Sequence, residues 1–273
     1  MALLHVFVLA IVQGLTEFLP ISSSGHLVLV WGGVDYLGLK VPQETAHSRL
    51  LLDIAVHVGT LLAVCLYYYR DLIAMLGGFF ALATGRITPG ARLALLVVIA
   101  SIPLALVGYF FLEEIAGSLH NIEVVAWATI IFALVLFVTD RVGMTLRRIE
   151  HMTVWAALLI GCCQVLALIP GASRSGITMS AARLLGYERT EAARFSLLMA
   201  IPAIAGPGLL LAHDVTQTPD VQFGYEVVLA AGMSFAVAFL TIALMIRWLQ
   251  YAGFAPFVVY RLLLGAALLY WIA

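Results

Sequence analysis

The chain has 273 residues, of which 63% are hydrophobic and only 11% are charged, and its mean hydropathy is +1.08. A soluble domain carries about 25% charged residues, so this composition excludes a soluble globular fold and predicts an integral membrane protein. The formal net charge of -1 gives no indication of a nucleic-acid partner. We expect a single membrane domain over residues 1–273.

Six apolar runs are long enough to cross a hydrocarbon core about 30 Å thick as α-helices, which rise about 1.5 Å per residue. They lie at residues 50–69, 92–112, 122–140, 191–212, 225–246 and 254–272. Two further apolar segments are interrupted: residues 1–30 by Pro20 and a run of serines, and residues 154–185 by LIPGASRSG at 168–176. Each half is too short to cross, so each segment is predicted to form a re-entrant hairpin buried in the protein. The expected fold is therefore all-α, with six transmembrane helices and two re-entrant helical hairpins, ten helical segments in all.

Arginine is distributed unevenly over the short connections, and cytoplasmic loops of membrane proteins are rich in Lys and Arg. The Arg-rich connections placed in the cytoplasm are 70–92, 141–148 and 183–194, together with Arg247. The connections placed outside are 113–121 and 212–225, which hold no Lys or Arg, and 31–49, where Lys40 and Arg49 are exceptions. The first hairpin then enters from the outside and the second from the cytoplasm.

The two halves of the chain, residues 1–150 and 151–273, have the same order of elements: one broken hairpin followed by three spans. Gln13 and Gly25 are twelve residues apart, as are Gln164 and Gly176, and both intervals contain a Pro and a Ser-x-Ser-Gly ending. A weak repeat with opposite topology is typical of inverted-repeat membrane proteins, whose site lies where the two broken elements meet. The sequence predicts such a repeat here.

Ionised groups at bilayer depth are costly unless they are paired or hydrated, so each one is a candidate site residue. Gln13 and Glu17 are spaced i, i+4, which places both on one face of the first half-helix. Their oxygens suit Mg²⁺ or Ca²⁺, with water and phosphate as further ligands. The alternative is a polar pair that bonds exposed backbone at the tip of the hairpin.

The SSSGH stretch offers Ser22, Ser23 or Ser24 as the N-cap of the second half-helix, and a helix N-terminus favours phosphate. His26 lies one turn after Ser23, which permits a serine nucleophile with a histidine base. The alternative is that the serines only cap the helix and that His26 bonds a backbone carbonyl.

In the second broken segment, Arg174 stands between Ser173 and Ser175, with Thr178 one turn further on. A planar guanidinium beside hydroxyls and helix-start amides can bind phosphate oxygens. The alternative is an arginine that only pairs with Glu17.

Three more polar residues lie within predicted spans. Asp53 and His57, again i, i+4, either extend a polar cavity toward the outside or form a satisfied pair in the core. Arg261 is about 10 Å from the cytoplasmic end of its helix, close enough to snorkel to the interface, and we expect it to have a structural role.

Two motifs, QGLTEFLPISSSGH (13–26) and PGASRSGIT (170–178), resemble the signatures of the bacterial undecaprenyl pyrophosphate phosphatase (bacitracin resistance) family. Further similar stretches are LDIAVHVGTLLAV (52–64), ARFSLLMAIPAIAG (193–206) and FAPFVVYRLLLG (254–265), so the resemblance covers nearly the whole chain. It implies a multi-pass enzyme of the bacterial inner membrane that removes the terminal phosphate of undecaprenyl pyrophosphate on the periplasmic side. This reaction returns the lipid carrier to cell-wall synthesis.

The resemblance also implies roles for the matching residues. Glu17, with Gln13, would hold the Mg²⁺ or Ca²⁺ ion, although Gln13 in place of Glu leaves one formal charge fewer. Ser23 would be a nucleophile or a phosphate ligand, and His26 a general base or acid. The residues expected to hold the phosphoryl group are Arg174, Ser22, Ser24, Ser173, Ser175 and Thr178.

Transport is the competing interpretation, because a lipid-phosphate flippase or a secondary anion transporter uses the same inverted repeat. The sequence also leaves open whether the chain forms a homodimer.

Overall fold

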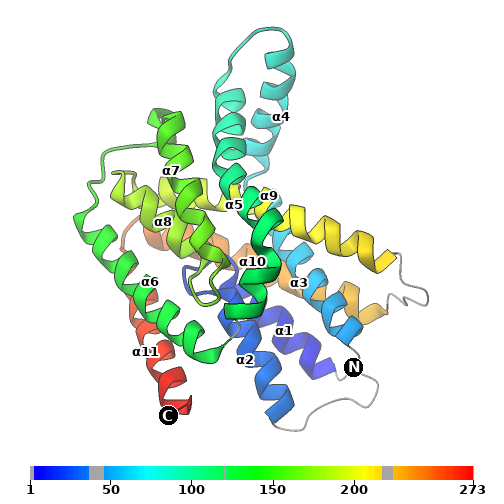
Figure 1. The fold of residues 1–273 in the computed structure, drawn as a ribbon. Helices are drawn as coiled ribbons and strands as arrows, with labels where there is room; N and C mark the ends of the chain where they lie inside the picture. Colours follow the sequence, from blue (N-terminus) through cyan, green and yellow to red (C-terminus); the bar gives the residue numbers. More distant parts are fainter. Residues whose placement is uncertain (1–2, 37–45, 120, 217–223, 273) are drawn as a thin grey trace.

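A computed structural model describes the chain except for residues 1–2, 37–45, 120, 217–223 and 273 (Figure 1). The described residues form helices joined by short connections, with no β-strand among them. The α-helices are α1 (Leu3–Thr16), α2 (Ser23–Tyr36), α3 (Ala46–Tyr67), α4 (Tyr69–Ala83), α5 (Pro89–Leu119), α6 (Ile122–Val142), α7 (Val154–Gln164), α8 (Arg174–Leu184), α9 (Arg189–Thr216), α10 (Tyr225–Leu249) and α11 (Ala255–Ile272). Two short 3₁₀ helices are η1 (Ile149–His151) and η2 (Val165–Leu168).

Six of these helices are long and apolar enough to cross a membrane, and they coincide with the six predicted spans. Their apolar stretches are Arg49–Tyr67, Pro89–Phe111, Ile122–Val142, Arg189–Leu210, Tyr225–Leu249 and Ala255–Ile272. The chain is therefore an all-α integral membrane protein, as its composition predicts. The orientation prediction depends on connections 31–49, 113–121 and 212–225, which lie partly outside the described residues.

One helix was not predicted. Residues 70–92 were interpreted as a cytoplasmic connection, but α4 occupies most of this stretch and packs against the start of α5. The two helices project together from one end of the molecule (Figure 1). Arg70 and Asp71 end the apolar run of α3, and for this reason the sequence pattern did not indicate the helix that follows. The described part of the chain forms eleven α-helices, where ten helical segments were predicted.

The two broken segments are built alike. Ser22 and Ser173 immediately precede α2 and α8, and they are the only described non-glycine residues with positive φ, at 73° and 71°. Each serine Oγ accepts a hydrogen bond from a glycine amide three residues later, Gly25 N at 3.3 Å and Gly176 N at 3.2 Å. The strained serine therefore both turns the chain and caps the next helix. The duplication with opposite orientation stays a prediction.

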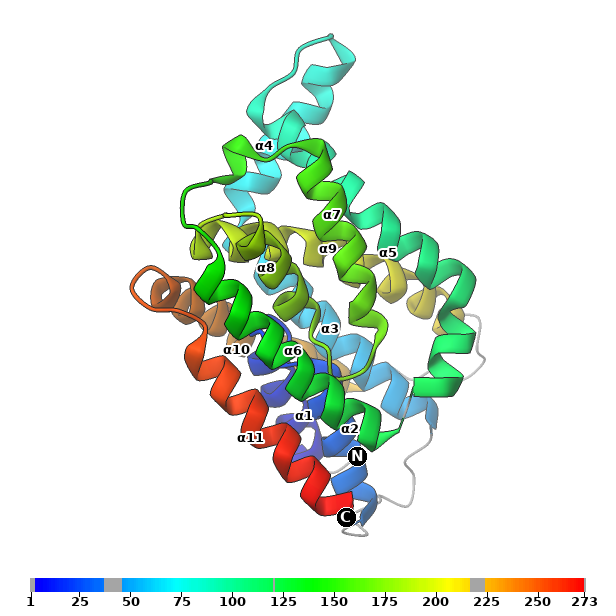
Figure 2. The ribbon, with the colours of Figure 1, turned by 60° about the vertical axis from the view of Figure 1, so that its left-hand side comes forward.

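Helix packing surrounds these breaks with longer helices. The half-helix α1 packs against α10, and α7 packs against α5. Helix α8 contacts α6 and α9, and α3 contacts both α9 and α10. Figure 2 shows α11 running alongside α6 on the outside of this arrangement. Backbone that is not helical is thus enclosed by protein, as membrane depth requires.

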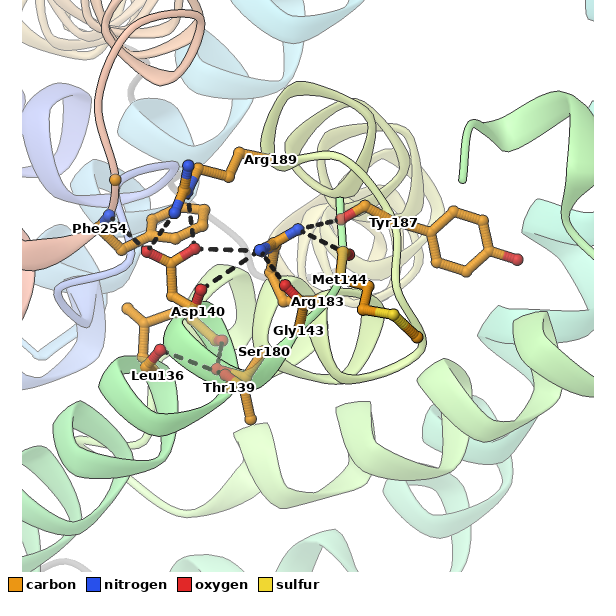
Figure 3. A network of polar contacts seen from close by, with 12 residues as sticks. Leu136, Thr139, Asp140, Gly143, Met144, Ser180, Arg183, Tyr187, Arg189 and Phe254 are labelled. Atoms are coloured by element: carbon orange, nitrogen blue, oxygen red, sulfur yellow. Dashed lines mark hydrogen bonds and ion pairs between the residues drawn. The ribbon is translucent and has the colours of Figure 1, made fainter. Parts of the chain in front are cut away.

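A buried ion network ties four elements together near the C-terminal ends of α6 and α8 (Figure 3). Asp140 accepts hydrogen bonds from Arg183 Nε at 3.1 Å, from Arg189 Nε at 2.7 Å and from the Phe254 amide at 3.3 Å. The Arg183 side chain is fully buried and also donates to the carbonyl of Gly143 at 2.8 Å. Two of the arginines assigned to the 183–194 connection therefore hold the fold together.

Candidate active site

The two breaks meet at a cavity of about 460 Å³. Its polar lining residues are Glu17, Ser23 and Ser24 from the first break, Ser173 and Arg174 from the second, and Asp53 and His57 from α3. Its apolar lining comes from α3, α5, η2 and α9 and includes Ile54, Leu104, Leu168, Ile204 and Pro207. The size and the few convergent polar groups are those of a small-molecule site.

Glu17 is the centre of the polar cluster. The residue lies just after α1, and its side chain is only 6% exposed. Its Oε1 accepts from Arg174 Nη2 at 2.7 Å, and its Oε2 accepts from Gln13 Nε2 at 2.9 Å and from Ser23 Oγ at 2.8 Å. His57 Nε2 is 4.0 Å from the same Oε2. The buried carboxylate is therefore stabilised by one cation and two neutral donors.

Arg174 reaches this carboxylate from the other broken segment. It is the first residue of α8, and the N-terminus of a helix favours anions because of the helix dipole. One guanidinium nitrogen, Nη2, bonds Glu17. The other, Nη1, is buried and has no hydrogen-bond partner among the described residues. A buried donor without a partner is costly, and it suits a ligand with anionic oxygens.

Several of the predicted phosphate ligands have other partners. Ser24 and Ser173 line the cavity, but Ser22, Ser175 and Thr178 are not among its described lining residues. Ser22 caps α2, and Ser175 Oγ donates to the Leu19 carbonyl at 2.9 Å. These two hydroxyls therefore support the fold of the breaks, and direct contact between them and a ligand stays a prediction.

Thr178 is buried and bonds residues of α8 and α9. Its Oγ1 donates to the Arg174 carbonyl at 2.9 Å and lies 2.7 Å from Ser196 Oγ. Thr178 thus fixes the first turn of α8, on which Arg174 stands, to α9. Sequence reasoning missed Ser196, although it falls in the stretch 193–206 that resembles the family.

His26 is not paired with Ser23. Its Nδ1 is 2.6 Å from the Ser22 carbonyl oxygen, and its Nε2 is 2.5 Å from the Tyr260 hydroxyl. The two rings are also stacked, with centroids 5.6 Å apart. Since a carbonyl only accepts, Nδ1 carries the proton and Nε2 accepts from the phenol. The predicted serine–histidine pair is therefore not formed here, and His26 instead joins α2 to α11.

Asp53 and His57 line the cavity, which supports the cavity alternative for this pair. His57 Nδ1 is 2.6 Å from the Asp53 backbone carbonyl, and Asp53 Oδ1 accepts from Trp31 Nε1 at 3.3 Å. The two side chains therefore do not bond each other. The i, i+4 spacing placed them on one face but did not show that Glu17 would lie opposite.

Arg261 does not snorkel. It is fully buried, and its guanidinium donates to the carbonyls of Gly171 and Ala172 at 3.0 Å each, Thr129 at 3.2 Å and Pro20 at 3.4 Å. Pro20 belongs to the first break, and Gly171 and Ala172 to the second. The structural role is confirmed, but its reason is different: irregular backbone exposes carbonyls that need donors.

The residues predicted to hold a divalent cation fit that role. Gln13 Oε1 is a buried acceptor with no hydrogen-bond partner among the described residues, and it belongs to the side chain that bonds Glu17. The described residues contain no cluster of three or more His, Cys, Asp and Glu side chains arranged for a metal. A carboxylate and an amide oxygen suffice for an ion that takes its other ligands from water and phosphate.

Comparison with known proteins shows the family of the chain. Residues 6–267 match the family model described as bacitracin resistance protein BacA. The chain is 47% identical to undecaprenyl-diphosphatase 1 of Rhodospirillum rubrum, covering 98% of this chain and 95% of that protein. It is 45% identical to the undecaprenyl-diphosphatases of a Jannaschia species, over 98% of each chain, and of Alcanivorax borkumensis, over 97% of each. The chain belongs to the bacitracin resistance protein BacA family.

Proposed function

We propose that this protein is an undecaprenyl-diphosphatase, which hydrolyses undecaprenyl pyrophosphate to undecaprenyl phosphate and inorganic phosphate. The observation that carries the proposal is the convergence of Glu17, Ser23 and Arg174, from the two broken segments, on one cavity. A carrier would need only groups that bind its cargo, and no group that reacts with it. A hydroxyl held against a carboxylate beside a guanidinium is the arrangement expected for phosphoryl transfer.

In this proposal Arg174 binds the terminal phosphate. Its Nη1 has no partner in the described protein, so it donates to a phosphate oxygen while Nη2 stays on Glu17. Ser173, the N-cap of α8, lines the same cavity. As the transition state forms, these fixed donors stabilise the negative charge on the equatorial oxygens of the transferred phosphoryl group without rearrangement.

Ser23 and Glu17 form the reacting pair. Ser23 Oγ donates to Glu17 Oε2 at 2.8 Å, so the carboxylate orients the hydroxyl and can accept its proton. In one path Ser23 attacks the terminal phosphorus, the bond to the bridging oxygen breaks to release undecaprenyl phosphate, and water then hydrolyses the phosphoserine. In the other path Ser23 holds a phosphate oxygen while water attacks the phosphorus and displaces undecaprenyl phosphate. A phosphate group trapped on Ser23 in rapid-quench experiments would establish the first path. Substantial turnover by Ser23→Ala would exclude it.

We place a divalent cation, Mg²⁺ or Ca²⁺, on Glu17 and Gln13. Glu17 already neutralises Arg174, so a multiply charged diphosphate needs additional positive charge at the site, which a bound cation supplies. The fit of Gln13 Oε1 supports this assignment.

We also propose that the protein lies in the bacterial inner membrane with the site open to the periplasm. The support is the arginine distribution over the connections. The cavity residues of α3 lie in the half of that helix that this distribution places outside.

The test is phosphate release from undecaprenyl pyrophosphate by the purified protein in detergent. We expect release that stops with a chelator, resumes with Mg²⁺ or Ca²⁺, and is lost in Glu17→Ala. A wild-type protein that binds the lipid but releases no phosphate under any metal condition would favour a flippase or anion carrier instead.

A further inference from the structure

A second hollow lies beside the cavity, between α3 and α10. This groove has a volume of about 580 Å³, and its lining residues, all from these two helices, are all apolar. Leu51, Val58 and Leu62 form one wall, and Phe235 belongs to the opposite wall. Val58 and Leu62 are 41% and 54% exposed, so the groove opens on the outer surface of the protein.

Close contact between the two helices gives the groove a fixed floor. A Cβ atom at Gly59 would lie 2.2 Å from the carbonyl oxygen of Ala231, so the backbones touch there. Ser234 Oγ on α10 also donates to the Val56 carbonyl on α3 at 2.9 Å. At the wall, Gly232 has open space, because a Cβ atom there would meet nothing within 4 Å. The hollow is therefore formed without a ligand.

The groove adjoins the catalytic cavity at one residue of α3. Helix α3 presents Leu50, Asp53 and His57 to the cavity and Leu51, Ala55 and Val58 to the groove. Ile54 lines both. Residues three and four apart share a helix face, so the two lining stripes are adjacent along α3.

We propose that this groove binds the part of the polyprenyl chain nearest the diphosphate, while the diphosphate occupies the catalytic cavity. The inference rests on the proposed function and deepens it. A cavity of about 460 Å³ holds a headgroup but not a long polyprenyl chain, so the chain must leave it. A route over Ile54 keeps the isoprenyl units against apolar side chains, and the charged groups remain in the cavity.

The competing exit is between α5 and α9, where Leu104 and Pro207 form the apolar wall of the cavity. The α3–α10 route is favoured because a second preformed hollow adjoins the cavity there, at Ile54. Bilayer lipid is as apolar as the groove, so the fit of the chain, more than its removal from water, must provide the selectivity. The expected effect of closing the groove is therefore moderate and depends on chain length.

The test uses Gly232→Phe, which fills the groove at a position where the fold has room, and Gly108→Phe as its matched control. Gly108 is on α5, also has nothing within 4 Å of its Cβ position, and lines neither hollow. Phosphate release is measured with prenyl diphosphates from one isoprenyl unit to the full undecaprenyl chain. We expect Gly232→Phe to raise KM by about threefold to tenfold for long chains. In this route a single isoprenyl unit extends only as far as Ile54, so the KM of the shortest substrate should rise less than that of the long chains. The control should resemble wild type throughout.

Photolabelling gives an independent readout. A prenyl diphosphate with a diazirine on its first isoprenyl units should label α3 and α10 in the wild-type protein, and unlabelled substrate should compete. Labelling of α5 and α9, labelling that substrate does not compete, or a Gly232→Phe penalty equal at all chain lengths would overturn the groove assignment. Wild-type protein that releases phosphate from none of the substrates would instead refute the proposed function.

Discussion

Removing the guanidinium of Arg261 should destabilise both irregular segments, the one before α2 and the one before α8. The side chain is fully buried and supplies hydrogen bonds to carbonyls of Pro20 on one break and of Gly171 and Ala172 on the other. In Arg261→Leu these acceptors lose a charged donor inside the protein, where the Arg261 side chain is fully buried. A buried acceptor left without a partner costs about 1–3 kcal/mol. Because the acceptors share one donor their costs do not add fully, and we expect a total loss of about 3–5 kcal/mol.

The measurement is thermal unfolding of the purified protein in detergent, followed by tryptophan fluorescence, with phosphate release on the same samples. A loss of this size lowers the unfolding midpoint by roughly 5–10 °C. Arg261→Lys should be nearly as damaging, since a single ammonium cannot reproduce the planar fork. The control is Arg247→Leu on α10, where the arginine is exposed. If the unfolding midpoint of Arg261→Leu equals that of this control within error, the reasoning about the breaks is refuted.

Two further changes test the packing around the site, both by the same unfolding assay. Asp140→Asn leaves the buried Arg183 without its counter-ion, and we expect the free energy of unfolding to fall by about 3–5 kcal/mol. Adding Arg183→Met should restore part of this loss. Unchanged stability of Asp140→Asn would contradict the expectation. Gly59→Ala forces α3 away from the Ala231 carbonyl and should cost about 1–3 kcal/mol. Gly232→Ala, which has open space, should cost nothing measurable, and equal effects of the two alanines would show that the contact is not as close as described.

Periodicity and composition were sufficient for the fold class and for much of the site. The six spans follow from run length alone, because a helix must be long and apolar to cross a bilayer. The two breaks follow from Pro20 and from the LIPGASRSG stretch, since irregular backbone at that depth has to be enclosed. Placing Glu17 opposite Arg174 required only that the breaks meet, and the two side chains are 2.7 Å apart.

Details that depend on distant packing were not predictable. The His26 ring turns to Tyr260, more than two hundred residues away, although its nearest polar neighbours in sequence are serines. Arg261 is drawn inward by carbonyls of the breaks, although its helix position permitted snorkelling. Helix α4 was not predicted because Arg70 and Asp71 interrupt the apolar pattern in its first turn. For His26 and Arg261 the partner lies on another element, which the local pattern does not specify.

The central claim is that Glu17 and Arg174, from two separate broken helices, act as one catalytic unit. A double-mutant cycle of Glu17→Gln and Arg174→Gln, read as kcat/KM for phosphate release from undecaprenyl pyrophosphate, tests it most directly. We expect each single variant to lose about 10²-fold or more, and the double variant to be no worse than the poorer single, because residues that act together are strongly non-additive. Losses that multiply in the double variant, as for independent sites, would contradict the account.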